Sequence, residues 1–545
     1  MRTSSATSRS TWWGQALQNN FIALVLAMVV VVPLLASPAD SRLAGVAVLA
    51  FEAFALLLAV TLMWRARWSL GREQITTFLK TGANTPVLLF MALAIVSCVF
   101  APNKLFAVQE TIKLGSGVLL YFVVAYQFRQ SKHLLMLVDT LIFLAIAVSF
   151  LTMAQYTLGN TALSGERGTM LFGNQQPLGS LLMILLPIVA VIALTETQLS
   201  KRQIAAQVAT VMTAGGLLLA QTRSGWMGAL AGLLVLVALV VYGGRTTKSR
   251  HNRKTAPIGF AAQKQKFVLP LMLAIVVVGF GISLKLQNSA IFDRASTLTQ
   301  TSTDASWQGR LRDWSGIVNM IEARPLTGWG IGQFPLYQHN FTGVGASGDA
   351  ITGLQTRGSL AEQAHNFYLQ TAADLGLPGL VLFLAILGSF FYLGVKRINE
   401  MNAGIRRNLL IGSIGATVAF AVDAISSPSW QFGQVSMFLW LMLGAGVGCM
   451  RPRSSQVEEA PTFVMAPRFV RPVALVAAAL MFALVVMPSA TLTAHASHKY
   501  NHKKDKKDKK VKKGALIVTA GLVLGYLFLG PNGGDGNPNN DDQDE

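Results

Sequence analysis

Apolar runs of near membrane length recur along most of this chain. A run of about 20 apolar residues is long enough to cross a bilayer as a helix, and such runs occur repeatedly within the first 450 residues. The predicted fold class is therefore an all-α polytopic membrane protein, with about 12 core transmembrane helices and one or two more near the C-terminus. The predicted spans are 21–37, 43–64, 86–101, 114–128, 133–156, 177–195, 204–220, 225–243, 267–286, 376–395, 408–426, 434–450 and 472–490, with a shorter candidate at 514–530.

A polar block at 287–375 interrupts this pattern. It is by far the longest stretch without a membrane-length apolar run, and it carries five arginines and no lysine. We interpret it as a large, partly helical loop on one side of the membrane. The chain then divides into transmembrane helices 1–9 at 1–286, the loop at 287–375, transmembrane helices 10–12 at 376–450, and a C-terminal region at 451–545 with extra spans, a lysine-rich run and a disordered acidic tail.

The distribution of charge supports the membrane interpretation and argues against nucleic-acid binding. The chain is 52% hydrophobic and 13% charged, with a formal net charge of +20. Lysine and arginine gather in alternate loops, among them 65–85, 244–266 and 396–407, as is typical of cytoplasmic loops. We therefore predict a cytoplasmic N-terminus, an outward-facing 287–375 loop and no nucleic-acid partner. The lysine run at 499–513 does not fit the alternation, so the topology of 472–545 stays open.

Three arginines on the outward side are candidates for phosphate binding. Arg167 precedes one span, Arg223 begins another and Arg310 lies in the loop. Guanidinium is always charged and grips phosphate oxygens in pairs, so converging arginines form a diphosphate site without a metal. The alternative for Arg167 and Arg223 is snorkelling to lipid headgroups. For Arg312, an ion pair with Asp313 is the simpler interpretation.

A histidine follows near the end of the loop. Ser359 and Glu362 form a capping box, which predicts a helix that begins near Leu360. On that helix Glu362, His365, Asn366 and Gln370 would occupy neighbouring positions. A histidine beside a carboxylate can act as a general base on a hydroxyl. The alternative is a surface histidine satisfied by solvent or by Glu362.

Two further patterns lie within the loop. Trp314, Ile317 and Ile321 recur at helical spacing, which predicts an amphipathic helix at the membrane surface. Glycines at 328, 330 and 332 predict a tight loop where the backbone approaches a ligand or another element closely. This run is not a nucleotide-binding fingerprint, because no strand–helix unit surrounds it; an ordinary turn is the alternative.

Metal and cofactor chemistry are not predicted. No His or Cys pair in the outer loops has the spacing of a metal site, and no Asp-x-Asp pair occurs there. Nucleotides are also absent outside the cytoplasm. The energy for any chemistry must therefore arrive in the substrate, and an activated, membrane-anchored phosphosugar meets this requirement.

Five segments carry a family resemblance. They are Arg-Gly-Thr…Gly-Asn at 167–174, Arg-Ser-Gly-Trp at 223–226, Arg310 with Trp314, Pro-Leu-Thr-Gly-Trp-Gly-Ile-Gly-Gln-Phe at 325–334, and His-Asn-Phe-Tyr-Leu-Gln…Asp-Leu-Gly-Leu-Pro-Gly at 365–379. Together they resemble the O-antigen ligase / O-antigen polymerase family of bacterial membrane C-type glycosyltransferases, which includes protein O-oligosaccharyltransferases. The resemblance covers residues 85–450, and Asp374 stands where many relatives have Glu.

The resemblance implies a function. An O-antigen ligase-like enzyme of lipopolysaccharide biosynthesis in the bacterial inner membrane would move a glycan from undecaprenyl diphosphate to a hydroxyl of lipid A-core or another acceptor, at the periplasmic face. Arg167, Arg223 and Arg310 would bind the diphosphate, and His365 would activate the acceptor, with support from Glu362, Asn366, Arg312 and Gln370. A polymerase or protein O-oligosaccharyltransferase of the same family fits equally well. Outside it, a lipid-linked glycan flippase or a non-catalytic scaffold are the alternatives.

Overall fold

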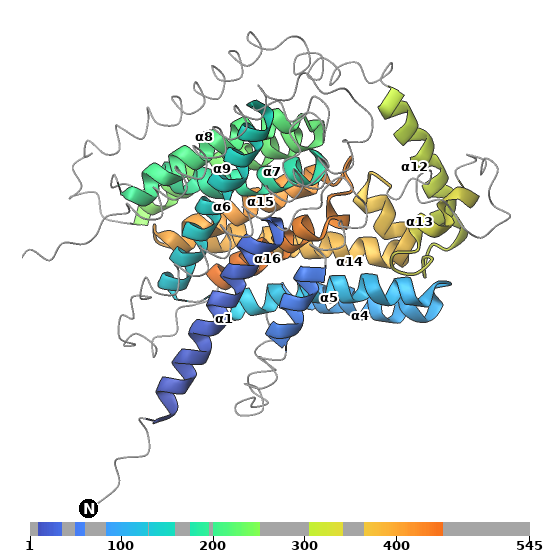
Figure 1. The fold of residues 1–545 in the computed structure, drawn as a ribbon, viewed down its shortest axis with the longest axis horizontal. Coiled ribbons are helices and arrows are strands. Elements are labelled where there is room, and N and C mark those ends of the chain that lie inside the picture. The colour runs from blue at the N-terminus through green and yellow to red at the C-terminus, as the bar shows by residue number, and fades with distance from the viewer. Residues whose placement is uncertain are drawn as a thin grey trace, which may run out of the picture. The chain divides into compact units, whose positions relative to one another are not determined.

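The part of the protein that the structure describes is built from helices. This computed structural model describes residues 9–34, 49–59, 83–128, 130–157, 175–195, 200–250, 305–341 and 364–450, all within a unit that spans Met1–Thr462. No strand occurs in these ranges (Figure 1). The helices are α1 (Arg9–Leu34), α4 (Asn84–Phe100), α5 (Lys104–Gln127), α6 (Ser131–Thr157), α7 (Gln175–Thr195), α8 (Lys201–Ala220), α9 (Arg223–Arg250), α12 (Ala305–Ala323), α13 (Phe334–Tyr337), η3 (Gln338–Asn340), α14 (Phe367–Ile398), α15 (Ile405–Asp423), η4 (Ser429–Gln431) and α16 (Gly433–Met450).

Eight of the described helices are long and apolar enough to cross a membrane. They are α5, α6, α7, α8, α9, α14, α15 and α16, and shorter apolar helices lie at Ile22–Leu34, Leu49–Ala59 and Asn84–Phe100. The prediction of an α-helical, multi-pass membrane protein is confirmed at this level. The predicted spans at 267–286, 472–490 and 514–530, the lysine-rich run and the acidic tail lie outside the described residues, so the count of about 12 core helices stays a prediction.

Helix α5 begins well before its predicted boundary. The span predicted at 114–128 is part of a helix that already begins at Lys104, where the side chain of Asn103 accepts a hydrogen bond from the Phe106 N–H at 3.1 Å. This capping bond satisfies a free N–H of the first turn. The polar residues that follow hide the helix from an apolar-run criterion, although α5 continues through them.

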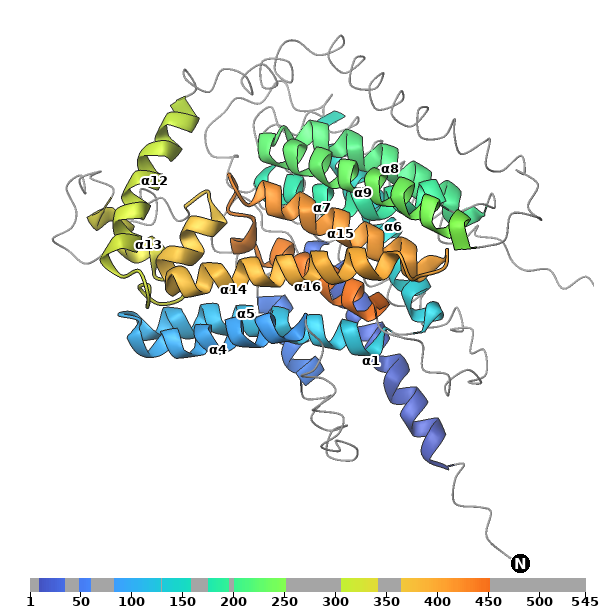
Figure 2. The same ribbon diagram turned by 180° about the vertical axis from the view of Figure 1, so that it is seen from behind.

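The centre of the bundle is tightly packed. Helix α15 packs against both α7 and α9, and α9 approaches it through Gly228 and Gly232. A Cβ on either glycine would lie 2.5 Å from a carbonyl oxygen of α15, that of Ala419 or Gly415. Small residues four apart on facing helices allow this close approach in membrane proteins. Figure 2 shows the other side of the bundle, where α4, α5 and α14 run alongside one another.

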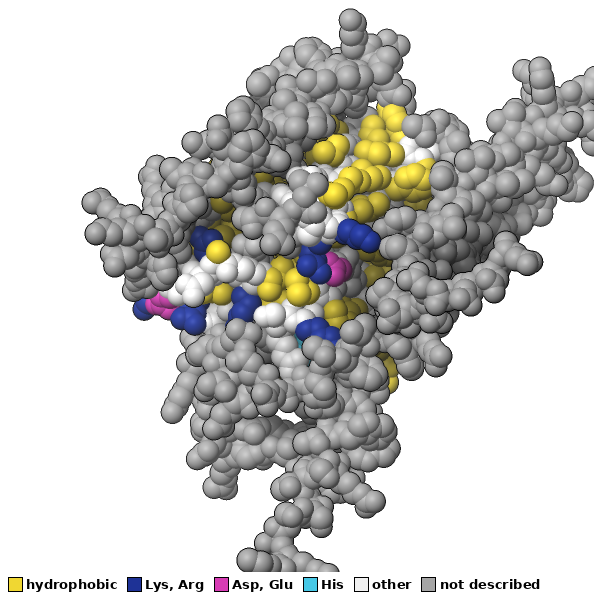
Figure 3. Space-filling view, turned by 90° about the vertical axis from the view of Figure 1, so that its left-hand side faces the viewer, with side chains coloured by type: hydrophobic (Ala, Val, Ile, Leu, Met, Phe, Trp, Pro, Cys, Tyr) yellow, Lys and Arg dark blue, Asp and Glu magenta, His cyan; other side chains and the backbone are white. Residues whose placement is uncertain are grey.

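The bundle has two chemically different ends. At one end, α14 passes into α15 through Lys396, Arg397, Arg406 and Arg407, and α8 begins with Lys201 and Arg202. Figure 3 faces this end and shows lysine and arginine side chains gathered on the visible surface. At the opposite end α14 begins just after His365, and α9 begins at Arg223. We call these the basic end and the His365 end.

Candidate functional site

His365 lies immediately before α14 rather than on it. The helix begins at Phe367, and the side chain of Asn366 caps it by accepting a hydrogen bond from the Leu369 N–H at 3.0 Å. The prediction that His365 and Asn366 lie within a helix that begins near Leu360 was therefore wrong. Asn is among the best N-cap residues, and it outcompetes the Ser359–Glu362 box as the start of this helix. Ser359 and Glu362 lie outside the described residues.

The backbone of His365 is in an unusual conformation. Its φ of 48° places it in the left-handed region, which few residues other than glycine adopt. Hydrogen bonds on both sides hold it there. The indole Nε1–H of Trp314 donates to the carbonyl of Ala364 at 2.9 Å, and the N–H of Phe367 donates to the carbonyl of Ala424 at 2.9 Å. Two distant parts of the chain, α12 and the residue after α15, thus fix the His365 segment.

Arg310, on α12, lies near His365. It lies four residues before Trp314, so the two side chains share one face of the helix. Since Trp314 is bonded to Ala364, that face is turned towards His365. Helix α12 confirms the amphipathic helix predicted from Trp314, Ile317 and Ile321. Ile317 and Met320 are buried against Phe334, Ala364 and Ala373, so packing of this face fixes the position of Arg310 relative to His365.

The His365 ring is held in its neutral form. Burial, together with the positive charge of Arg310, lowers the pKa of His365 to about 4. Both effects disfavour imidazolium. Its Nδ1 atom is also buried, with no hydrogen-bond partner among the residues that the structure describes. A neutral imidazole is the form that can accept a proton from a substrate hydroxyl.

The role of general base predicted for His365 makes a test by pH dependence possible. A base must be unprotonated, and a pKa of about 4 leaves His365 neutral at all higher pH. We expect kcat/KM, which reports groups of the free enzyme, to stay flat from about pH 8 to about pH 5 and to fall only below that. Transfer measured across this range in proteoliposomes checks it. A fall centred near the ordinary histidine pKa of about 6.5 contradicts the geometry.

The glycine-rich segment packs directly on the first turns of α14. The N–H of Trp329 donates to the carbonyl of Ala373 at 2.9 Å, and that of Gly330 to the carbonyl of Asp374 at 2.8 Å. The Asp374 carboxylate in turn accepts from the Phe334 N–H at 2.8 Å. The predicted close approach to another element is confirmed, and Gly328, Gly330 and Gly332 all have positive φ. Two motifs forty residues apart are thus one structural unit.

Gly376 lies where this unit meets the membrane-length part of α14. It interrupts the helix with φ 72° and ψ 178°, a combination that is open only to glycine. A Cβ there would lie 2.6 Å from the carbonyl oxygen of Leu326.

A substitution at this kink tests the structure of the unit. We expect Gly376→Ala to destabilise the protein by about 1–3 kcal/mol and to lower its melting temperature in detergent. The matched control is Gly388→Ala on the same helix, where an added Cβ meets nothing within 4 Å and alanine favours the helix. Equal melting temperatures for the two variants would contradict the assigned backbone.

Arg223 is the first residue of α9, beside a buried polar cluster. The next residue, Ser224, lies 3.4 Å from Nε2 of Gln176, which donates to Ser427 at 2.8 Å. Ser180 donates to the Asp423 carboxylate at 3.0 Å, and Asp423 is fully buried. The cluster ties the starts of α7 and α9 to the segment after α15, whose Ala424 accepts from Phe367. It therefore links the Arg223 turn to the His365 segment.

The remaining predicted residues divide into two groups. Gln370 is buried, and its Oε1 accepts from the Ala364 N–H at 3.4 Å, so it contacts the segment that carries His365. Arg312 is on α12, but its side chain lies outside the described part, as do Arg167 and Glu362. Convergence of Arg167 and Arg223 on His365 therefore stays a prediction.

Sequence reasoning missed the Asp423 cluster. From the sequence alone, Asp423 is an isolated acidic residue within the apolar run at 408–426. It lies instead at the last residue of α15, surrounded by the hydroxyls of Ser180 and Ser429. These serines are separated by some 250 residues in sequence, so no local pattern could reveal the cluster. Asp139, which also lies within an apolar run, pairs with Arg202 at 2.5 Å.

The fold and this end of the bundle define a class: an α-helical, multi-pass membrane protein with an arginine and a neutral histidine brought together outside its spans. Comparison with protein families narrows it. Residues 208–384 match the family model described as O-antigen ligase. The resemblance to the O-antigen ligase family is therefore confirmed over this region, which contains Arg223, Arg310 and His365 but not Arg167. Comparison with curated proteins gives no match.

Proposed function

We propose that this protein transfers a glycan from undecaprenyl diphosphate to a hydroxyl of lipid A-core, at the periplasmic face of a bacterial inner membrane. The observation that carries the proposal is the position of His365. It is neutral, beside Arg310, and inside the region that matches the O-antigen ligase family.

The mechanism uses few groups. His365 removes the proton of the acceptor hydroxyl as its oxygen attacks the anomeric carbon of the donor sugar. The bond from that carbon to the diphosphate breaks, the electron pair leaves with undecaprenyl diphosphate, and the configuration at carbon is inverted. Arg310 and Arg223, with Arg167, stabilise charge on the leaving diphosphate. Donors fixed in place for a developing charge are commonly the largest contribution to catalysis. The histidinium then returns its proton to water.

The undecaprenyl chain and the diphosphate of the donor would bind to different parts of the protein. The undecaprenyl chain lies among the apolar helix surfaces, several of which expose large side chains such as Leu230, Leu234 and Val381. The diphosphate would lie at the His365 end, away from the positive charge of the basic end. The lysines and arginines of the basic end set the orientation of the chain rather than binding the donor.

A reconstituted assay tests the function. Full-length protein in proteoliposomes receives undecaprenyl-diphosphate glycan with lipid A-core, with a serine-containing peptide, or with no acceptor. Product on lipid A-core supports the ligase, product on the peptide replaces it with protein glycosylation, and chain growth without acceptor replaces it with polymerisation. Movement of a fluorescent lipid-linked glycan across the bilayer with no product in any arm would overturn the enzyme and favour a flippase.

A further inference from the structure

A cavity beside the His365 segment has no role in the transfer step. It lies between the α4–α5 hairpin, the first turns of α14 and the η4 segment, and it leaves about 50 Å³ for the centres of water molecules, room for roughly four. Its walls include five polar side chains and several aromatic rings. Those used below are Phe106, Glu110, Phe367, Gln370, Trp430 and Gln431.

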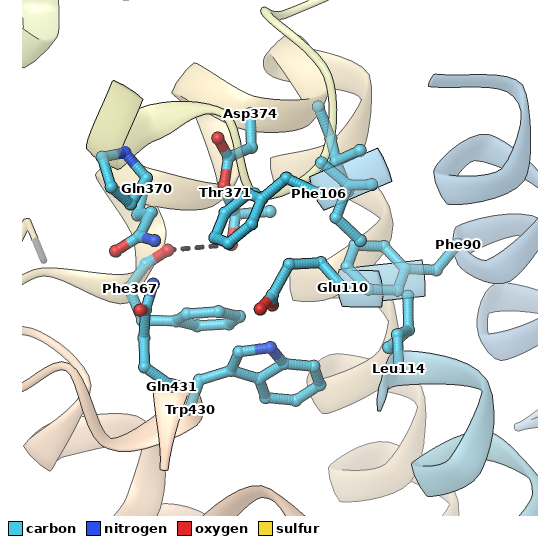
Figure 4. Close-up of a pocket in the computed structure, with 14 residues that line it drawn as sticks. Phe90, Phe106, Glu110, Leu114, Phe367, Gln370, Thr371, Asp374, Trp430 and Gln431 are labelled. Carbon is cyan, nitrogen blue, oxygen red and sulfur yellow. Dashed lines mark hydrogen bonds between the residues drawn. The ribbon is translucent and has the colours of Figure 1, made fainter. Parts of the chain in front are cut away.

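One wall is aromatic. The rings of Phe367 and Trp430 are stacked, with centroids 4.8 Å apart and planes at 25°, and Phe106 lines the cavity opposite them (Figure 4). Trp430 is further wedged against Trp440, at 5.7 Å between centroids, so the wall is rigid. Flat aromatic surfaces suit the C–H face of a sugar ring, since that face is apolar while the hydroxyls point outward.

The two carboxylates that line the cavity differ in the contacts they already make within the protein. Asp374 lines the cavity as well, but its carboxylate accepts from the backbone N–H of Phe334 and holds the glycine-rich segment. Glu110 differs. Its carboxylate points into the space beside the Phe367 and Trp430 rings (Figure 4), and it is fixed from behind by an ion pair with Lys113 at 2.5 Å. A carboxylate has about four acceptor positions, so one ion pair leaves Glu110 able to accept from ligand hydroxyls.

Two amides complete the set. Gln370 uses its Oε1 to accept from Ala364, which leaves its NH₂ group for another partner, and Gln431 comes from η4. A rigid aromatic wall, a preoriented carboxylate and two amides match a ring that carries several hydroxyls. The negative charge of Glu110 disfavours an acidic sugar.

We propose that this cavity binds a single neutral sugar ring of the glycan substrate, with Glu110 accepting hydrogen bonds from its hydroxyls and Trp430 packing on its apolar face. This inference rests on the proposed function for the identity of the substrate. Because Gln370 also holds Ala364, a ring in the cavity would lie next to the segment that carries His365. The donor and the acceptor can both supply such a ring, and the second arm of the test separates them.

Direct binding tests the cavity without reference to transfer. The tryptophan fluorescence of full-length protein in detergent is titrated with the methyl glycosides of a neutral hexose and of a hexuronic acid. The neutral glycoside should change the signal, the acidic one should not, and Trp430→Phe should remove the response. Glu110→Gln should weaken binding by roughly tenfold to a hundredfold, the range for hydrogen bonds to a charged group.

Matched variants separate binding from folding. Glu400→Gln makes the same substitution at the basic end, where Glu400 pairs with Arg397 at 2.6 Å, and should leave binding unchanged. Gln431→Ala provides a second variant if Glu110→Gln melts early. Equal binding of the neutral glycoside by the unaltered protein, Glu110→Gln and Gln431→Ala would overturn the proposal, as would equal binding of the hexuronic acid.

Transfer kinetics supply the second arm. Glu110→Gln should raise KM by tenfold or more for the substrate whose sugar fills the cavity, with a smaller effect on kcat. A rise for the donor alone assigns the cavity to the donor, and a rise for the acceptor alone to the acceptor. If the protein binds the glycoside but transfers nothing, the cavity proposal stands and the proposed reaction fails.

Discussion

Replacing His365 by alanine is expected to lower the rate of glycan transfer by about 100- to 10,000-fold, the usual contribution of a general base. His365 is neutral and is the base of the proposed reaction, whereas an alanine side chain cannot accept a proton. Initial rates in proteoliposomes, with matched amounts of inserted protein, measure the effect.

A second variant at His365 distinguishes loss of the base from loss of the local fold. His365 has a left-handed backbone, and asparagine tolerates that conformation better than alanine does. His365→Asn should therefore keep the local fold while it removes the base. Equal loss in both variants supports proton transfer by His365. Full activity of a normally inserted His365→Asn protein would remove the base from the mechanism.

The second large effect concerns the arginines. Arg310→Ala and Arg223→Ala should each lower kcat by about 100- to 1,000-fold, as when one preorganised donor is removed from a developing charge. Arg223→Lys and Arg310→Lys should recover only part of this loss, because lysine cannot make the paired contacts of guanidinium. Single-turnover rates with bound donor measure the effect.

The two arginines should differ in one respect. Arg310 lowers the pKa of His365, so its removal should raise that pKa and shift the acid limb of kcat/KM upwards. Arg223→Ala should lower the rate without such a shift. The control is Arg202→Ala at the basic end, whose half-exposed pair with Asp139 is worth at most about 1 kcal/mol and whose loss should leave transfer intact. An unshifted profile for Arg310→Ala contradicts its placement beside His365.

The sequence predicted the helices better than the site. Apolar length revealed α7, α8 and α16 nearly to the residue, because burial in lipid or protein requires an apolar surface over the whole helix. It missed the start of α5, where Glu110 and Lys113 are paired with each other and so tolerated on a helix. The two charges are three residues apart in the sequence, but only the fold shows that Glu110 lines a cavity.

Local patterns were least reliable around His365. Ser359 with Glu362 satisfies the rule for a capping box, yet Asn366 caps the helix. The deciding contacts come from afar: Trp314 is 50 residues away from Ala364, and Ala424 is further still from Phe367 in the opposite direction. Composition placed an arginine and a histidine in one loop, but only tertiary hydrogen bonds bring Arg310 and His365 together.

The break at Gly376 also determines which parts move together. Residues 367–375 are bonded to the glycine-rich segment through Ala373 and Asp374, and to the end of α15 through Ala424. Beyond the break, the rest of α14 is tied to the same segment by one hydrogen bond, from the N–H of Leu377 to the carbonyl of Pro325 at 2.8 Å. A change in the tilt of that span, as in a thinner or thicker bilayer, can be absorbed at Gly376. The His365 segment proposed for transfer is therefore held by α12 and the residue after α15, and the span beyond Gly376 can tilt without displacing it.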